Sequence, residues 1–150
     1  MTLNVSDLGV GVSHSAMVVE NLTRTQIVQY AGASGDYNPL HTDEVFATQV
    51  AGYPSVFAHG MLTMGLTGKM LTDYVGDGRL TRFGGRFNSQ VWPGDTLTAT
   101  ATVTAVRAES EVTVVDFDVV TENQSCAAVF SGTATAAFTR TNVLSQIKNL

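Results

Sequence analysis

One change in sequence pattern, near residue 78, limits the fold more than any other feature. Beyond it, runs rich in Val, Thr and Phe alternate with short polar breaks, which is typical of strands. In one such run, apolar residues alternate with threonines from Leu97 to Val103, so one face should be apolar. The breaks are short enough to make the last three strands an antiparallel meander. Four strands are predicted, over residues 79–88, 96–106, 111–121 and 125–138.

One strand and two short helices are predicted ahead of residue 58. The strand covers residues 11–20. Thr23 and Gln26 have the spacing of a capping box, so a helix should begin at Arg24 and end where Gly32, Ser34 and Gly35 accumulate. A second helix, to about residue 49, is predicted from a cap, two acidic residues and an apolar face: Thr42, Asp43 and Glu44, then Val45, Phe46 and Val50.

The third helical segment runs from His59 to about Tyr74 and is apolar nearly all round, which predicts a buried helix. It contains three glycines, each costing about 0.5–1 kcal/mol relative to alanine in a helix interior. We therefore expect another element, most simply the sheet, to approach the helix backbone closely at Gly60, Gly65 and Gly68. The whole order predicts an α+β fold in which an antiparallel sheet wraps around a buried helix.

Length and composition predict one folded domain over residues 1–150. Apolar residues make up 44% of the chain and charged residues only 14%, against about 25% in an average domain. Such a low charge content suggests that a partner covers part of the surface, so we expect an oligomer. The net charge of −5 has the wrong sign for nucleic-acid binding.

Targeting and redox features predict a soluble, cytoplasmic protein. Cys126 is the single cysteine and cannot form an internal disulfide or supply a zinc set. The first ten residues lack the basic start of a secretory signal, and no stretch of 18 apolar residues could span a bilayer. We therefore expect no membrane association.

The loop between the first two predicted helices carries the candidate chemistry. Pro39 pushes Asn38 out of the α region, so Asp36 and His41 should lie in an irregular loop. A turn at Asn38 and Pro39 would bring the carboxylate and the imidazole together as an acid–base pair. The alternative is that Asp36 and Asn38 only form a turn and His41 only precedes a helix cap.

Gly60, at the start of the apolar helix, is the second candidate. The amide of such a residue is unpaired and lies at the positive end of the helix dipole. Because glycine lets a carbonyl oxygen come close, Gly60 suggests a carbonyl substrate.

The run from Tyr30 to His41, followed by Ala58–Met61, closely resembles the hydratase motif of MaoC-like (R)-specific enoyl-CoA hydratases. The resemblance covers about residues 10–138, and the run Asp-x-Asn-Pro-Leu-His is specific. It implies a hotdog fold, in which an antiparallel sheet wraps a long central helix and two protomers join their sheets into one.

The same resemblance implies roles for single residues. Asp36 and His41 would hold and activate a water molecule, Asn38 would fix the loop, and the Gly60 amide would receive the thioester oxygen. The expected reaction hydrates trans-2-enoyl thioesters of coenzyme A or acyl carrier protein to (R)-3-hydroxyacyl thioesters, or runs backward as a dehydration. Enolate stabilisation and two proton transfers suffice for it, so no metal or redox cofactor is expected.

One departure from the family leaves the partner open. Some members carry a serine eight residues after the helix-start glycine, where this chain has Gly68. Gly65 and Gly68 resemble instead the actinobacterial dehydratase subunits of fatty-acid elongation, which pair with a non-catalytic hotdog subunit. Homodimer and heterodimer both stay open, as do two alternative functions: a partner-dependent or non-catalytic hotdog subunit, and a hotdog acyl-CoA thioesterase.

The remaining candidates have plain structural alternatives. His59 is expected to pack or cap the helix and is left out of catalysis. Met61, with Met64 and Met70, forms a stripe that is usually core but could line an acyl tunnel. Arg82 and Arg86 lie four apart on one strand face, where they could meet coenzyme A phosphates or only solvent.

Overall fold

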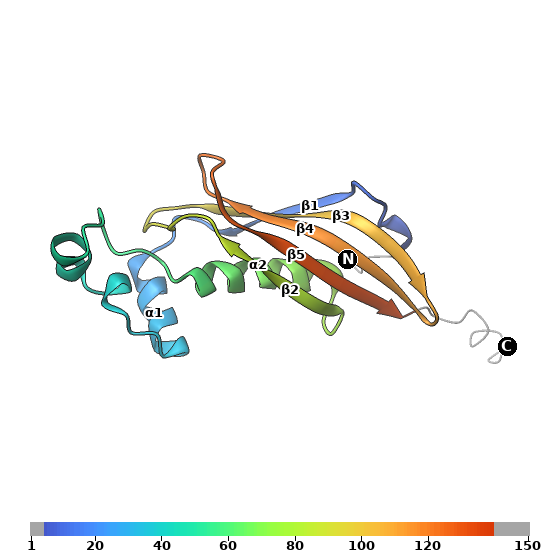
Figure 1. Cartoon of the computed structure of the whole chain (residues 1–150), viewed down its shortest axis with the longest axis horizontal. Helices are drawn as coiled ribbons and strands as arrows, with labels where there is room; N and C mark the ends of the chain where they lie inside the picture. The colour runs from blue at the N-terminus through green and yellow to red at the C-terminus, as the bar shows by residue number, and fades with distance from the viewer. Residues whose placement is uncertain (1–4, 140–150) are drawn as a thin grey trace.

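The structure, a computed structural model, describes residues 5–139. Five antiparallel strands form one curved sheet around the long helix α2 (Gly60–Val75), as Figure 1 shows. The predicted domain was 1–150, and residues 1–4 and 140–150 lie outside the described part. The strands are β1 (Ser13–Val19), β2 (Leu80–Phe87), β3 (Leu97–Glu109), β4 (Val112–Glu122) and β5 (Ala128–Thr139).

The strand order is β1-β3-β4-β5-β2, so β3, β4 and β5 form the predicted meander and β1 and β2 are the two edges. The register places Phe117 of β4 between Val103 and Ala134. Leu97 and Val103 are buried while Thr98 and Thr104 are exposed, which confirms the predicted two-faced strand.

Two hydrophobic clusters hold the layers together. The first packs Leu71 and Val75 of α2 against Phe117 and Phe130 of the sheet. The second joins four parts of the chain that surround the start of α2: Ile27, Ala58, Leu97 and Val129. This second cluster fixes where α2 begins relative to the segment before it.

Helix α2 is buried on one face only, which corrects the expectation of a helix buried all round. Met61 is 54% exposed and Gly65 is exposed, whereas Thr67 and Leu71 are fully buried. The sheet covers only one side of α2, so the opposite side faces outward.

The glycines of α2 approach β2 at two of the three predicted positions. A Cβ on Gly60 would lie 2.9 Å from the Phe87 ring, and one on Gly68 would lie 3.3 Å from Phe83. Gly65 has no atom of residues 5–139 within 4 Å of that position, so the expectation was wrong there.

Helix α1 (Arg24–Ser34) begins and ends for the predicted local reasons. The Thr23 side chain accepts from the Gln26 amide while the Gln26 side chain accepts from the Thr23 amide, and Gly35 ends the helix with φ 74°. Together with the segment that follows, α1 lies beyond one end of the sheet (Figure 1).

The second predicted helix differs from expectation, since Phe46–Val50 (η3) is wound as a π-helix. The Ala51 amide donates to the Phe46 carbonyl five residues back, which moves side chains off the 3.6-residue spacing. Val45 and Val50 are 59% and 70% exposed, so the predicted apolar face is wrong. Its cap is Asp43, which accepts from the Phe46 amide, rather than Thr42.

The strand boundaries differ from the predicted ones by one to three residues, and β3 ends at Glu109 instead of residue 106. Strand β1 starts at Ser13, because Gly11 adopts φ 89° in a turn. Strand β5 starts at Ala128, because Asn123 caps a turn in which Cys126 has φ 59°. Cys126 is therefore exposed in a turn rather than at the start of a strand.

Within residues 5–139, every helix is too short or too polar to cross a membrane. The cytoplasmic location stays a prediction from cysteine content.

Candidate active site

Short-range side-chain hydrogen bonds shape the loop between Ser34 and His41. The Asp36 amide donates to Ser34 Oγ (3.2 Å), the Asn38 amide to Asp36 Oδ1 (3.2 Å), and the Leu40 amide to Asn38 Oδ1 (3.0 Å). Pro39 then begins a single 3-10 turn, η2 (Pro39–His41), which Asn38 caps. The chain thus folds back as the Asn-Pro pair predicts, and Asn38 lies where it can fix the loop.

This turn brings together the two side chains predicted to form the acid–base pair. A carboxylate oxygen and two ring nitrogens, one atom each from Asp36, His41 and His59, lie within 4.8 Å of one another. Asp36 is exposed, whereas both imidazoles are buried. A small ligand at this point can therefore touch the carboxylate and an imidazole together.

The tautomer of His41 follows from its surroundings. Its Nδ1 lies 2.7 Å from the Phe57 carbonyl, which can only accept, so Nδ1 carries the proton and Nε2 has the free lone pair. Burial lowers the pKa of His41, against the opposing effect of the bond to Phe57. His41 is thus a neutral imidazole with Nε2 free to accept a proton.

His59 lies in this site as well, which sequence reasoning missed. As predicted, it is packed, with 2% exposure, but its side chain does not cap α2. Its Nε2 lies 3.0 Å from the Asp36 carbonyl, and its ring stacks on His41 with centroids 3.7 Å apart. Its position next to Gly60 was the only signal in the sequence.

Gly60 follows His59 directly and is the first residue of α2. The His59 carbonyl accepts from the Leu62 and Thr63 amides, whereas the Gly60 and Met61 amides have no partner among residues 5–139. The start of α2 therefore presents two free N–H groups directly after His59.

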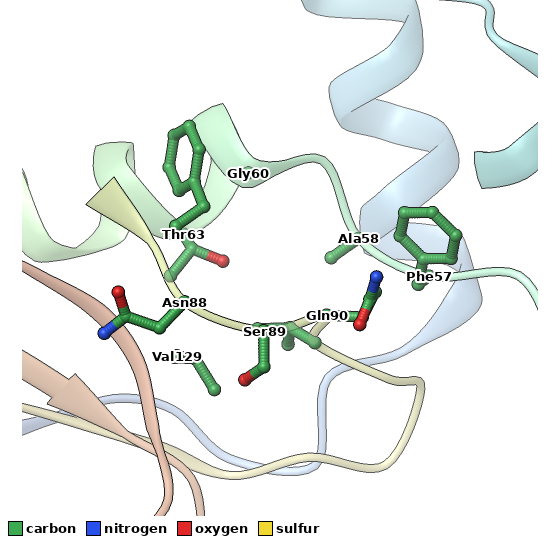
Figure 2. Close-up of a pocket in the computed structure, with 10 residues that line it drawn as sticks. Phe57, Ala58, Gly60, Thr63, Asn88, Ser89, Gln90 and Val129 are labelled. Carbon is green, nitrogen blue, oxygen red and sulfur yellow. The ribbon is translucent and has the colours of Figure 1, made fainter. Parts of the chain in front are cut away.

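A cavity of about 260 Å³ opens at this helix start (Figure 2). Gly60 and Thr63 of α2 line one side, Phe57 and Ala58 another, and the polar residues that follow β2 close it: Asn88, Ser89 and Gln90. The lining residues do not include Asp36, His41 or His59, so the cavity adjoins the helix start rather than the acid–base pair itself.

The other predicted substrate-binding residues lie elsewhere. Met61 is exposed next to Gly60 and does not line the cavity. Arg82 and Arg86 are exposed on β2, and Arg82 lines a different pocket together with Asp116. Contact of either arginine with phosphates stays a prediction.

The carboxylate and two imidazoles also form a donor set of the kind that binds metals. His41 Nδ1 and His59 Nε2 are already bonded to backbone carbonyls, which leaves one nitrogen on each ring. The rings are stacked with 27° between their planes, so their in-plane lone pairs run side by side rather than converging. This geometry suits a water molecule better than a tetrahedral metal ion.

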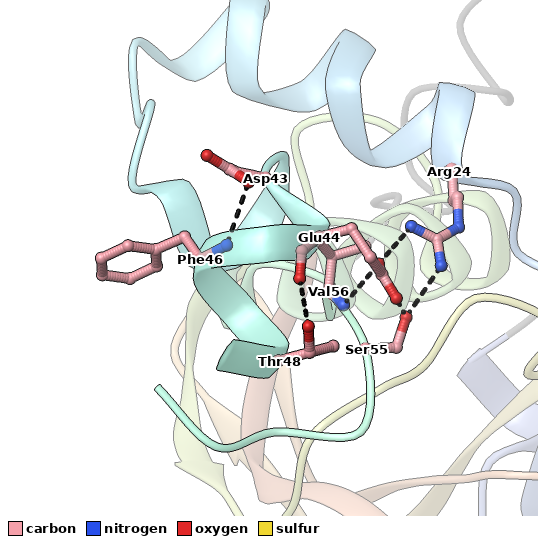
Figure 3. Close-up of polar contacts among 7 residues, drawn as sticks. All are labelled: Arg24, Asp43, Glu44, Phe46, Thr48, Ser55 and Val56. Atoms are coloured by element: carbon pink, nitrogen blue, oxygen red, sulfur yellow. Dashed lines mark hydrogen bonds and ion pairs between the residues drawn. The ribbon is translucent and has the colours of Figure 1, made fainter. Parts of the chain in front are cut away.

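A polar cluster ties α1 to the segment that leads into the site (Figure 3). Glu44 Oε2 accepts from Arg24 Nη1 at 2.6 Å and from the Val56 amide at 3.3 Å. Arg24 Nη2 also donates to Ser55 Oγ. The hydrogen bond from Arg24 lowers the pKa of the exposed Glu44 carboxyl. Residues 55–60 are thus held from α1 on one side and, through Phe57, from Leu40 on the other.

Comparison of the sequence with known protein families and relatives identifies the family of this chain. A family model described as "MaoC like domain" matches residues 11–124. The chain belongs to the MaoC-like family. An (R)-specific enoyl-CoA hydratase of Rhodospirillum rubrum is 35% identical over 99 residues, which are 65% of this chain and 68% of that protein.

Other relatives of this MaoC-like domain are longer or more distant. The 3-hydroxyacyl-thioester dehydratase Y of Mycobacterium tuberculosis is 46% identical over 67 residues, 43% of this chain but only 23% of that protein. The chain thus spans under a quarter of the length of such relatives. The solved (R)-hydratase of A. caviae involved in PHA biosynthesis superposes with a TM-score of 0.76 at 27% identity, over 88% of this chain and 98% of that one. The predicted hotdog fold is confirmed.

Proposed function

We propose that this MaoC-like domain interconverts trans-2-enoyl and (R)-3-hydroxyacyl thioesters by adding or removing water. The observation that carries the proposal is the convergence of Asp36 and His41 with His59, the residue directly before the free amides of α2. The relatives named as (R)-specific hydratase and hydroxyacyl-thioester dehydratase support the same reaction.

In the proposed hydration, a water molecule is held between the Asp36 carboxylate and His41 Nε2. Its oxygen bonds to the β-carbon of the enoyl group while one of its protons is taken up by this pair. The pair returns a proton to the α-carbon, so the product gains one water and the enzyme is unchanged. The buried, neutral state of His41 suits it to accept the first proton.

The thioester oxygen becomes negatively charged as the water adds, because the electrons of the double bond move onto it as an enolate. The Gly60 amide would donate to that oxygen, and one such preorganised bond is worth about 3 kcal/mol. The cavity at Gly60 is where the thioester group would lie.

A second hotdog subunit is part of the proposal. Strand β2 is a sheet edge, and Phe87 on that strand is 50% exposed and lies against Gly60 of α2. Met61, the residue after Gly60, is 54% exposed. An edge strand that ends in an exposed aromatic residue is suited to pairing with another sheet, either of a second copy or of a different hotdog chain.

The test measures loss of enoyl absorbance with crotonyl-CoA and longer trans-2-enoyl-CoA substrates. Asp36→Asn should lower kcat by about 10²- to 10⁴-fold, as expected when a positioned acid–base group is lost. Asp77→Asn, which makes the same change at an exposed residue of the turn after α2, should keep wild-type activity.

Two further measurements separate this function from its alternatives. In the reverse direction, (R)-3-hydroxybutyryl-CoA should be dehydrated and the (S) isomer should not. A thiol-trapping dye should detect no free coenzyme A, whereas rapid release would identify a thioesterase. No turnover at any chain length, for the chain alone and with candidate partner subunits, would overturn the proposal.

A further inference from the structure

The structure stacks a second imidazole on the proposed base. His41 and His59 have ring centroids 3.7 Å apart and 27° between their planes. The Tyr30 ring of α1 also lies against His59, with centroids 4.9 Å apart and 58° between the planes. The titratable groups that face His59 are therefore Asp36, His41 and Tyr30, and the acid–base function proposed above uses only the first two.

The hydrogen bonds of the two rings fix opposite tautomers. His59 Nε2 faces the Asp36 carbonyl at 3.0 Å, so it must carry a proton in order to donate. His41 instead donates from Nδ1 to the Phe57 carbonyl at 2.7 Å. One imidazole is thus protonated at Nε2 and the other at Nδ1.

Among the buried side-chain nitrogen and oxygen atoms of residues 5–139, His59 Nδ1 is the one that lacks a hydrogen-bond partner. On a neutral ring this nitrogen is a lone pair, whose burial without a partner costs less than that of a charged N–H donor. The polar contact of the His59 side chain within the described residues therefore runs through Nε2 alone.

We infer that His59 is a positioning residue, which holds the Asp36 main chain by its Nε2–H and the His41 ring by stacking. The inference rests on the proposed function and deepens it. The His59–Asp36 bond joins residues 23 apart, linking the acid–base loop to the residue before Gly60. His59 would thus set the distance between the water-holding pair and the amide that receives the thioester oxygen.

Two substitutions separate the two contacts. His59→Gln keeps an N–H near the position of Nε2 but lacks the ring, and His59→Phe keeps a ring for stacking but lacks the donor. The matched control is His14→Phe, because His14 also stacks on an aromatic ring, Tyr74, with centroids 4.1 Å apart.

Crotonyl-CoA hydration is the kinetic readout. His59→Phe should lower kcat by about 10- to 100-fold with little change in KM, the loss expected when reacting groups shift by about 1 Å. His59→Gln should retain more activity than His59→Phe, and His14→Phe should match wild type. Wild-type kcat in a folded His59→Phe variant would overturn the inference, and so would a parallel loss in kcat and melting temperature.

A measurement without substrate keeps the inference testable if both variants fail to fold. The chain has three histidines, so 15N-labelled histidine gives a simple NMR spectrum that His14→Phe helps to assign. At neutral pH the wild type should show His59 as the Nε2–H tautomer and His41 as the Nδ1–H tautomer. The same tautomer on both rings would refute the inference. Inactivity of the wild type with every enoyl thioester would refute the proposed function, while these spectra would still report on His59.

Discussion

A buried pair of threonine hydroxyls joins α2 to the sheet, and its hydrogen-bond directions predict an unequal response to mutation. Thr67 Oγ1 donates to the Thr63 carbonyl at 2.9 Å, and Thr67 Oγ1 and Thr121 Oγ1 lie 2.7 Å apart. Because a hydroxyl has one hydrogen, Thr121 must be the donor in that pair. Both side chains are 0% exposed.

Removing the acceptor should therefore cost more than removing the donor. Thr67→Val leaves the Thr121 O–H buried without a partner, which costs about 1–3 kcal/mol. Thr121→Val removes one hydrogen bond but leaves the Thr67 hydrogen on its carbonyl, so the loss should be nearer about 1 kcal/mol. In the double variant the orphaned hydroxyl is gone, so it should be more stable than Thr67→Val alone.

Urea denaturation followed by far-UV circular dichroism, at one protein concentration, measures these free energies of unfolding. The decisive quantity is the change in the free energy of unfolding that Thr121→Val causes in two backgrounds. The substitution should destabilise the wild type but stabilise the Thr67→Val variant. Simple additivity, or a larger loss for Thr121→Val than for Thr67→Val, would refute the assigned hydrogen-bond directions.

Three further outcomes are expected. Gly85→Ala should destabilise the fold by about 1–3 kcal/mol in urea denaturation, because the added Cβ would lie 2.8 Å from Gly132 Cα. A Cβ on Gly84 would have no atom of the described chain within 4 Å, so Gly84→Ala should leave the stability unchanged. Equal losses in the two variants would contradict this expectation. Burial lowers the pKa of His41, so the acid limb of kcat/KM should have its midpoint below about pH 6.5. For the same reason, the stability contributed by neutral His41 should be complete above pH ~6.5 and decline as the pH falls. A kinetic midpoint above pH ~6.5 would contradict the prediction. Dialysis against EDTA should leave hydration unchanged, and activity that needs added zinc would contradict the geometry of the stacked rings.

The parts of the fold and site that could be predicted are those governed by neighbouring residues. The capping box at Thr23 and the turn at Asn38 depend on side chains within a few positions, so they followed from the sequence. Asp36 and His41 converge for the same reason. Their catalytic roles stay proposals.

The features that were missed depend on contacts between distant segments. His59 reaches Asp36 across 23 residues, and local pattern alone made it a packing residue. The segment Phe46–Val50 is π-helical, which the 3.6-residue period behind the predicted apolar face does not anticipate, and Val50 is exposed. Gly65 faces outward because the sheet covers only one side of α2, a property of the tertiary structure rather than of the helix sequence.

The short range of the bonds in the 34–41 loop has a consequence for biosynthesis. The side-chain bonds that shape this loop span only two to four residues, whereas β1 pairs with β3 across about eighty, as at Met17 and Thr98. A chain emerging from the ribosome exposes its N-terminal half first, so the loop can adopt its bend before β3, β4 and β5 have been translated. The site would then be completed only when the sheet forms and α2 packs against it. A translational pause after α2 would give a chain whose loop is already bent but whose helix has no sheet to pack on.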